Sequence, residues 1–96
     1  MSRVRWAPQA AEDLQAIREF IRRDSPRYAT AVVEQIIAAV DVLDRFPLAG
    51  RIVPEHARDD LRELIRPPYR IVYRVLAEGI HVVTVFRTSQ LIPALP

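Results

Sequence analysis

The apolar residues of this chain change their spacing half-way along it, and that change restricts the fold more than any other feature. Up to residue 45 they recur every three or four positions, which is the period of an amphipathic helix. Between residues 61 and 87 they form short alternating or continuous runs, which are typical of strands. A helical half followed by a sheet half predicts an α+β domain whose helical hairpin packs on one face of an antiparallel sheet.

Two helices are predicted in the first half of the chain. The first begins at Pro8, after a short strand candidate at residues 3–6, because the fixed φ angle of proline suits the first helical position. The second runs from Pro26 to about Arg45, and Ser25 before it is a good N-cap. The apolar stripe of the second helix is so wide that we expect both the first helix and the sheet to cover it.

Three strands are predicted in the second half, at residues 61–66, 69–76 and 80–87. Pro67-Pro68 forces the turn between the first two strands, and residues 77–79 form a short hairpin loop before the third. Tyr73 is expected in the core, and residues 51–60 are expected to form a loop. The predicted order is therefore βααβββ, with one sheet face left free of helices.

Composition limits the class of protein. The 96 residues are enough for one domain, residues 1–96, and half of them are hydrophobic. The chain has no cysteine, which excludes disulfides and thiolate chemistry and fits a reducing compartment. It also lacks the run of roughly 20 apolar residues that a membrane span needs, and its N-terminal segment is charged and amphipathic, unlike a signal peptide. We therefore expect a cytoplasmic protein with no membrane partner.

The residue types that carry most active-site chemistry are scarce or scattered. His56 and His81 lie far apart, with no carboxylate or thiol at ligand spacing, so neither a metal site nor a cofactor is expected. The serines have no obvious base, and two glycines cannot build a phosphate-cradling loop. Glu12 and Asp13 fall in the first turns of the first predicted helix, where the helix dipole favours acids. That position explains both acids without catalysis.

Arginine is the main functional signal. All 14 basic residues are arginines, so every cationic contact is a planar fork suited to carboxylates and phosphates. In residues 1–48 seven arginines balance seven acids, whereas residues 61–96 carry five arginines against two acids. An anionic partner would therefore be attracted mainly to the C-terminal third of the chain.

The turn at the two prolines decides how these arginines are presented. Arg62 and Arg66 share a face of one strand, as do Arg70 and Arg74 in the next. A two-residue loop would place the two pairs on opposite faces and a three-residue loop would unite them, which the sequence leaves open. We expect the arginines to collect on the helix-free face, where Glu63 is their one nearby acid. They would bind a phosphate backbone or an acidic peptide; an ordinary solvated face is the alternative.

Several segments, taken in order, resemble the RelE/ParE toxin family. The resemblance covers nearly the whole chain, and the order and spacing of the segments are more specific than any one of them. They are Trp6 to Leu14 with Ile17, Ser25-Pro26, Phe46-Pro47-Leu48-Ala49-Gly50-Arg51, Leu61-Arg62-Glu63-Leu64, Pro68 to Val75, and Ile80 to Arg87. The resemblance implies the toxin of a bacterial type II toxin–antitoxin pair, held in a hetero-oligomer by the C-terminal segment of its cognate antitoxin.

Two activities occur on the fold of this family. RelE-like members cut messenger RNA in the ribosomal A site, and for that activity the resemblance assigns Arg62, Arg70 and Arg87 as catalytic residues. ParE-like members inhibit DNA gyrase and are not known for a conventional active site. Leu64 stands where a second basic residue is expected, and residues 88–91 contain no Tyr or His. We therefore expect a ParE-like gyrase inhibitor, which is not an enzyme, more than a nuclease.

The basic-aromatic ending common in ParE-like members is also missing, so two alternatives stand beside gyrase inhibition. One is the ribosome-dependent endoribonuclease; the other is a degenerate member that binds its antitoxin but has lost toxicity. In each case we expect the surface that contacts target or antitoxin to consist of Arg62, Arg66, Tyr69, Arg70, Arg74, Arg87, Leu91 and Ile92.

Overall fold

The computed structural model of the chain describes residues 3–95, and the predicted α+β fold is confirmed. The first half contains β1 (Val4–Trp6), α1 (Pro8–Arg22), α2 (Pro26–Asp41) and a 3₁₀ turn, η1 (Val42–Asp44). The second half contains β2 (Arg51–Ile52), β3 (Leu61–Arg66), β4 (Tyr69–Leu76) and β5 (Gly79–Arg87). The predicted βααβββ order holds with β2 as an addition, because the segment expected to be a loop begins with two strand residues.

Both helices begin with proline, as the sequence predicts. Ser25 is the N-cap of α2, and its side chain accepts a hydrogen bond of 3.1 Å from the backbone N–H of Tyr28. The helix ends at Asp41 rather than at Arg45, because the chain tightens into the 3₁₀ turn of η1 before it reaches Pro47. Among residues 3–95, no helix is long and apolar enough to cross a membrane.

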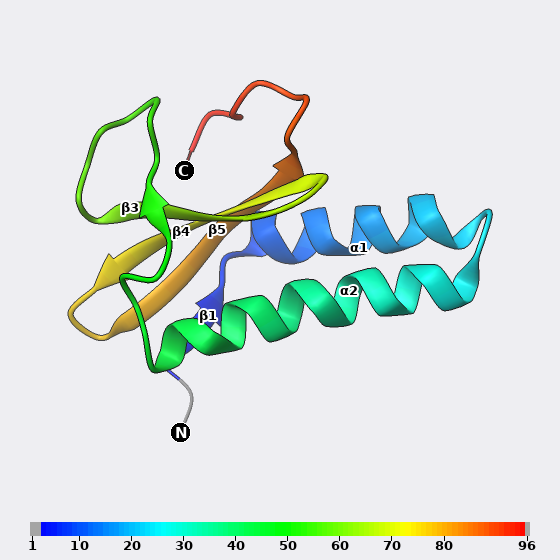
Figure 1. Cartoon of the computed structure of the whole chain (residues 1–96), viewed down its shortest axis with the longest axis horizontal. Helices are drawn as coiled ribbons and strands as arrows, with labels where there is room; N and C mark the ends of the chain where they lie inside the picture. The colour runs from blue at the N-terminus through cyan, green and yellow to red at the C-terminus, as the bar shows by residue number, and fades with distance from the viewer. Residues whose placement is uncertain (1–2, 96) are drawn as a thin grey trace.

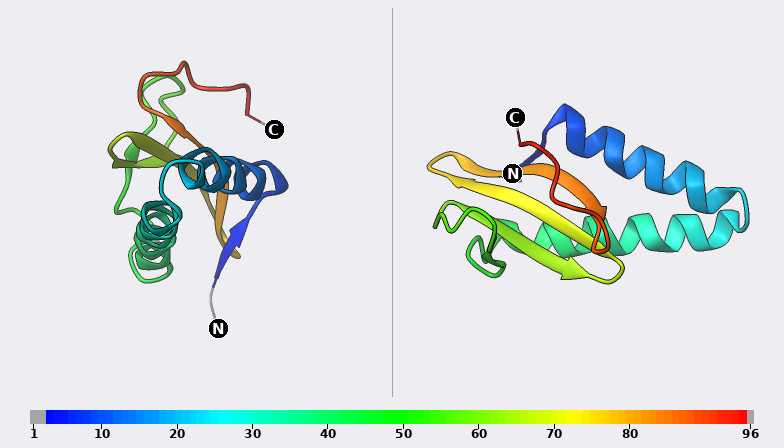
Figure 2. Two further views of the ribbon diagram at one scale, coloured as in Figure 1. Left: turned by 90° about the vertical axis from the view of Figure 1, so that its right-hand side faces the viewer. Right: turned by 90° about the horizontal axis from the view of Figure 1, so that it is seen from above.

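The sheet has five strands in the order β1-β5-β4-β3-β2. The three long strands form antiparallel hairpins, whereas β1 lies parallel to β5, so the sheet is mixed. The helical hairpin of α1 and α2 lies along one side of this sheet and extends beyond its end (Figures 1 and 2). Residues far apart in the sequence therefore meet where α1 passes β5.

The side of the sheet that faces the helices is an apolar core. Its fully buried residues include Ile36, Val40, Leu43, Ile71, Tyr73 and Val82. The Tyr73 hydroxyl donates to Pro47 O at 2.8 Å and accepts from the Gly50 N–H at 2.9 Å. A Cβ at Gly50 would lie 2.6 Å from that hydroxyl, so only glycine fits there. Tyr73 is thus a core residue, as predicted, and it also fixes the loop after α2.

The opposite side of the sheet, called here the far face, is covered as well. A second buried cluster lies there, made of Val53, Leu61, Val72, Val83 and Phe86. The tail, residues 88–95, packs Ile92 and Leu95 against this cluster. The expectation that this face is free and collects the arginines is therefore wrong: a sheet face rich in valine and phenylalanine is unfavourable in water, and the chain's own loop and tail cover it.

The turn at Pro67-Pro68 is a two-residue loop, which settles the question that the sequence left open. Arg66 pairs with Tyr69 across the hairpin, and Arg62 pairs with Tyr73, so both arginines are on the helix side of the sheet. The arginines of β4 lie opposite Leu61 and Ile65 on the far face. The two pairs of arginines therefore lie on opposite faces and form no common patch.

Candidate partner-binding groove

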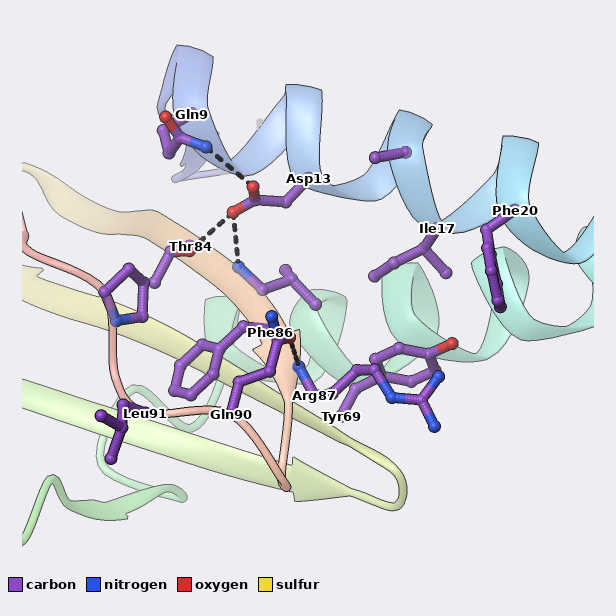
Figure 3. A pocket seen from close by; sticks show the side chains of 13 residues that line it. Gln9, Asp13, Ile17, Phe20, Tyr69, Thr84, Phe86, Arg87, Gln90 and Leu91 are labelled. Atoms are coloured by element: carbon purple, nitrogen blue, oxygen red, sulfur yellow. Dashed lines mark hydrogen bonds between the residues drawn. The ribbon is translucent and has the colours of Figure 1, made fainter.

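An apolar groove of about 470 Å³ runs between α1, the end of β5 and the tail (Figure 3). Among the residues that line it are Ile17 and Phe20 of α1, Tyr69 of β4, Arg87 at the end of β5, and Leu91 and Pro93 of the tail. The side chains of Phe20 and Leu91 are 61% and 93% exposed, although both are large and apolar. Exposed apolar side chains beside a hollow are typical of a surface that another protein covers.

Two arginines lie at the end of this groove that is next to the Pro67-Pro68 turn. Arg66, Tyr69 and Arg87 are cross-strand neighbours on β3, β4 and β5, so they form one row on the helix side of the sheet. Tyr69 is buried, whereas both arginines are exposed. Neither guanidinium forms an ion pair with a carboxylate of residues 3–95. The groove therefore offers an apolar wall with positive charge at one end.

Arg70, in contrast, is bound by the chain's own acids. Its Nε donates to Glu63 Oε1 at 2.7 Å, and its two terminal nitrogens donate to Glu55 at 2.8 and 2.9 Å. Its side chain is only 11% exposed, and the guanidinium lies 5.0 Å from the centre of the Phe86 ring. Glu63 is fully buried and also accepts from Arg51 Nε at 2.6 Å. Arg70 is the centre of a network that ties the loop after β2 to the far face.

The pKa values of Glu55 and Arg70 reflect this network. The hydrogen bonds from Arg70 are the largest cause that holds the pKa of Glu55 at about 2, down from 4.5. The hydrogen bonds to Glu55, in turn, raise the pKa of the Arg70 guanidinium above its ordinary value. Both groups therefore remain charged, and paired with each other, throughout the neutral range.

Arg62 is also engaged within the molecule. Its Nε donates to Asp59 O at 3.1 Å and its Nη1 to Gly50 O at 3.0 Å, so it connects the residue before β2 with the end of the loop before β3. The structure separates the three residues that a nuclease would use. Arg70 lies on the far face, whereas Arg62 and Arg87 lie opposite Tyr73 and Tyr69, which are four residues apart along β4.

The predicted contact residues therefore divide into three groups. Tyr69, Arg87 and Leu91 line the groove, and Arg66 lies in the row beside it. Ile92 packs against the far-face cluster, and Arg70 and half-buried Arg74 lie on the same face of the sheet. Arg62 holds the loop before β3. The site that was expected to be one arginine surface is thus a mixed apolar and basic groove and, separately, an internal network.

Three groove or network residues were not predicted. Phe20 is a large apolar residue of α1 that remains exposed at the groove. Glu55 lies in a loop without a periodic pattern, which gave no signal of its role. Asp13 was explained by the helix dipole; instead its carboxylate accepts hydrogen bonds from Thr84 and Val85 of β5. No local pattern could have revealed that contact, because more than seventy positions separate the partners.

The fold and the groove define a class: a small α+β domain whose helical hairpin covers one sheet face and whose last long strand borders an apolar groove. Residues 4–92 match the family described as "ParE toxin of type II toxin-antitoxin system, parDE". The chain therefore belongs to the RelE/ParE toxin family of type II toxin–antitoxin systems, as the sequence resemblance predicted.

Curated relatives agree with this family. The chain is 36% identical over 92 residues to "Toxin RelE2" of Caulobacter vibrioides, and the match covers 95% of this chain and 100% of the relative. It is also 36% identical over 90 residues to "Putative toxin Y4kP" of Sinorhizobium fredii, with 92% of this chain and 90% of the relative covered.

Two solved structures have the same fold. One belongs to the "Chromosomal ParDE TA system from P. aeruginosa", with a TM-score of 0.72, 28% identity, and 91% of this chain and 95% of that chain covered. The other is from the toxin–antitoxin complex RelBE2 of Mycobacterium tuberculosis, with a TM-score of 0.54, 27% identity, and coverages of 88% and 94%. Both structures come from toxin–antitoxin systems.

Proposed function

We propose that residues 1–96 form one toxin domain that acts in the cytoplasm by binding DNA gyrase, and that a cognate antitoxin neutralises it. The observation that carries this proposal is the position of Arg70 between Glu55 and Glu63. A toxin that works by occupying its target needs an exposed binding surface, whereas a nuclease needs cations available to the phosphate of the messenger.

Arg70 is poorly placed to bind a phosphate. All three of its nitrogens donate to carboxylates, and the Glu63 carboxylate among them is fully buried. A phosphate would have to displace these carboxylates and leave buried negative charge without its partner, which is costly. The greater similarity to the ParDE structure than to the RelBE2 structure, with TM-scores of 0.72 and 0.54, favours a ParE-like member of the family.

We propose that the antitoxin binds in the groove between α1 and β5. The groove pairs apolar side chains with the exposed cations of Arg66 and Arg87. An amphipathic segment with apolar residues on one side and an acidic residue near these cations would complement it in shape and charge. The similarity to structures from two toxin–antitoxin systems supports a hetero-oligomer with such a partner.

The gyrase proposal is tested with the purified chain in two assays run together. Inhibition of supercoiling by DNA gyrase, with messenger left intact in primer extension on translating ribosomes, is the expected result. Cuts in the ribosomal A site without inhibition of supercoiling would establish the nuclease alternative instead. If neither effect is seen and overexpression is harmless, the chain is a degenerate member and the proposal is wrong.

The groove proposal has its own test, with a matched pair of variants. Phe20→Asp places a charge in the groove, whereas Tyr28→Asp changes a residue of α2 with nearly the same exposure, 60% against 61%, that does not line the groove. The antitoxin candidate is the tagged product of the neighbouring reading frame. Its co-purification with the chain is expected to fall at least about tenfold for the first variant only. Equal loss in both variants, or in neither, would contradict the groove as the binding site.

A further inference from the structure

The outer edge of β5 is only partly covered by another strand. β1 pairs with residues 80–82, and the Ala7 N–H donates to Val82 O at 2.9 Å, but β5 continues to Arg87. The register of β5 against β4 shifts near this point, and α1 rather than a strand follows β1. A strand edge without a neighbour exposes backbone groups that can pair with another chain.

Two side chains take the place of the missing strand. Asp13 Oδ2 accepts a hydrogen bond of 3.0 Å from the Val85 N–H, and Gln90 Oε1 accepts one of 2.9 Å from the Arg87 N–H (Figure 3). The two amides are two residues apart, so they point to the same edge of β5. Oxygens from α1 and from the tail therefore bind the N–H groups that a neighbouring strand would bind.

Asp13 is held firmly in this position. Thr84 Oγ1 donates to the same oxygen, Oδ2, at 2.6 Å, and Gln9 Nε2 donates to Oδ1 at 2.8 Å (Figure 3). An ionised carboxylate suits this arrangement because it accepts at both oxygens and donates at neither. An asparagine would present only one accepting oxygen, so it would leave one of these donors without its partner.

The strand beside Asp13 has the composition of a self-pairing segment. Residues 79–87 read Gly-Ile-His-Val-Val-Thr-Val-Phe-Arg, which is rich in β-branched residues, has one full charge and contains no proline. Segments of this kind pair readily with copies of themselves when an edge is exposed. Because a strand edge can be self-complementary in an antiparallel pair, two copies could join through the same residues about a two-fold axis.

We propose that Asp13 and Gln90 are edge caps, which prevent β5 from pairing with the β5 strand of a second copy of the chain. Asp13 is the main cap, because both of its oxygens are engaged and it stands on a helix, whereas Gln90 is an exposed residue of the tail. Both residues also line the groove proposed for the antitoxin, but the test uses the chain alone and needs neither the antitoxin nor the target.

Replacing Asp13 by alanine tests the proposal in the full chain. In Asp13→Ala, the Val85 amide is expected to exchange with solvent at least about tenfold faster by NMR. Sedimentation velocity is expected to show dimers or larger species that increase with concentration, whereas the unaltered chain remains monomeric. Glu12→Ala is the matched control, because Glu12 is an exposed acid one position earlier on α1; it should behave as the unaltered chain in both measurements.

Two variants that change the edge less than Asp13→Ala allow the proposal to be tested even if that variant does not fold. Asp13→Asn retains one acceptor and is expected to self-associate less than the alanine variant. Gln90→Ala is expected to speed exchange at Arg87 while Val85 is unchanged. A folded Asp13→Ala variant that stays monomeric at every concentration, or whose Val85 amide exchanges at the original rate, would overturn the proposal. If the alanine variant does not fold, the combined Asp13→Asn and Gln90→Ala variant must self-associate for the proposal to stand.

Discussion

The two faces of the sheet are stabilised in different ways, although neighbouring residues of the same strand belong to both. On the helix side, Ile71 and Tyr73 pack in an apolar core. On the far face, Val72 lies under the tail, and Arg70 is the centre of an ion network that holds a loop. A face covered by helices needs only apolar side chains of suitable shape. A face covered by a loop and a tail also uses charged residues to hold its cover in place.

This difference bears directly on function. Two arginines that the resemblance assigned to a nuclease bind groups of this chain instead. Arg62 donates to backbone carbonyls on either side of β2, and Arg70 donates to the carboxylates of Glu63 and Glu55. Of the arginines on β3, β4 and β5, the two that are exposed, Arg66 and Arg87, lie instead at the end of the groove on the helix side. Neither forms an ion pair with a carboxylate of residues 3–95. Positive charge in the sequence therefore overstates the charge that this chain presents to a phosphate.

The largest effect is expected from breaking the far-face network at its buried acid. Glu63→Gln should lower the free energy of unfolding by about 3 to 4 kcal/mol, because Arg70 and Arg51 would then face a neutral amide in a buried site. Urea unfolding followed by circular dichroism measures this. The control is Glu78→Gln in the exposed β4–β5 turn, expected to change stability by no more than about 0.5 kcal/mol.

A double variant sharpens the comparison between the faces. Replacing Arg70 and Glu63 together by methionine and leucine should leave the free energy of unfolding within about 1.5 kcal/mol of the original, because an apolar pair can replace a buried ion pair. A double variant as unstable as Glu63→Gln alone would show that apolar packing cannot replace the network on the far face.

A core truncation on the helix side should cost slightly less than the broken network. Ile71→Ala is expected to lower the free energy of unfolding by about 2 to 3 kcal/mol, since it leaves a cavity under α2 at a fully buried position. The same urea experiment measures it. A loss below about 1 kcal/mol would mean that the helices are not packed on this face as described.

The tail offers a smaller effect with an adjacent control. Ile92→Ala should cost about 1 kcal/mol, because Ile92 is partly buried against the far-face cluster. Leu91→Ala should leave stability unchanged, because that side chain is 93% exposed. Thermal unfolding of the two variants side by side measures the difference. Equal midpoints would indicate that the tail does not cover the far face.

The smallest effect is expected from acid. The pKa of Glu55 is about 2 in the folded chain and 4.5 ordinarily. A lowered folded-state pKa stabilises the fold fully above the unfolded value, and that contribution is lost as the pH falls from about 4.5 towards 2. Between about pH 5 and about pH 2.5, the original chain should therefore lose slightly more stability than Glu55→Gln. The margin is small because the Glu55 side chain is 40% exposed. Identical acid profiles would argue against the Glu55–Arg70 pair.

The fold was predictable because it follows from local periodicity. The strands at residues 61–66 and 69–76 have the bounds that alternation indicated, and proline and serine mark the helix starts. The pairing of β1 was not predictable in the same way, because it depends on a contact with residues 80–82 at the far end of the chain. Local patterns indicate elements, whereas contacts between distant residues decide which faces and edges are covered.

The candidate site was less predictable for the same reason. Tyr69, Arg87 and Leu91 were predicted and do line the groove, but Phe20, which also lines it, was not predicted. The contact of Arg70 with Glu55 could not be inferred, since Glu55 is fifteen positions away in an irregular loop. A count of arginines and acids cannot show which charges neutralise each other in the folded chain.

Growth arrest by the double variant with methionine at Arg70 and leucine at Glu63 tests the central claim, that Arg70 stabilises the fold and does not bind a phosphate of the messenger. Expressed without its antitoxin, this variant should arrest growth as the original chain does, provided that urea unfolding shows it folded. A folded double variant that no longer arrests growth, while the original chain does, would contradict the claim.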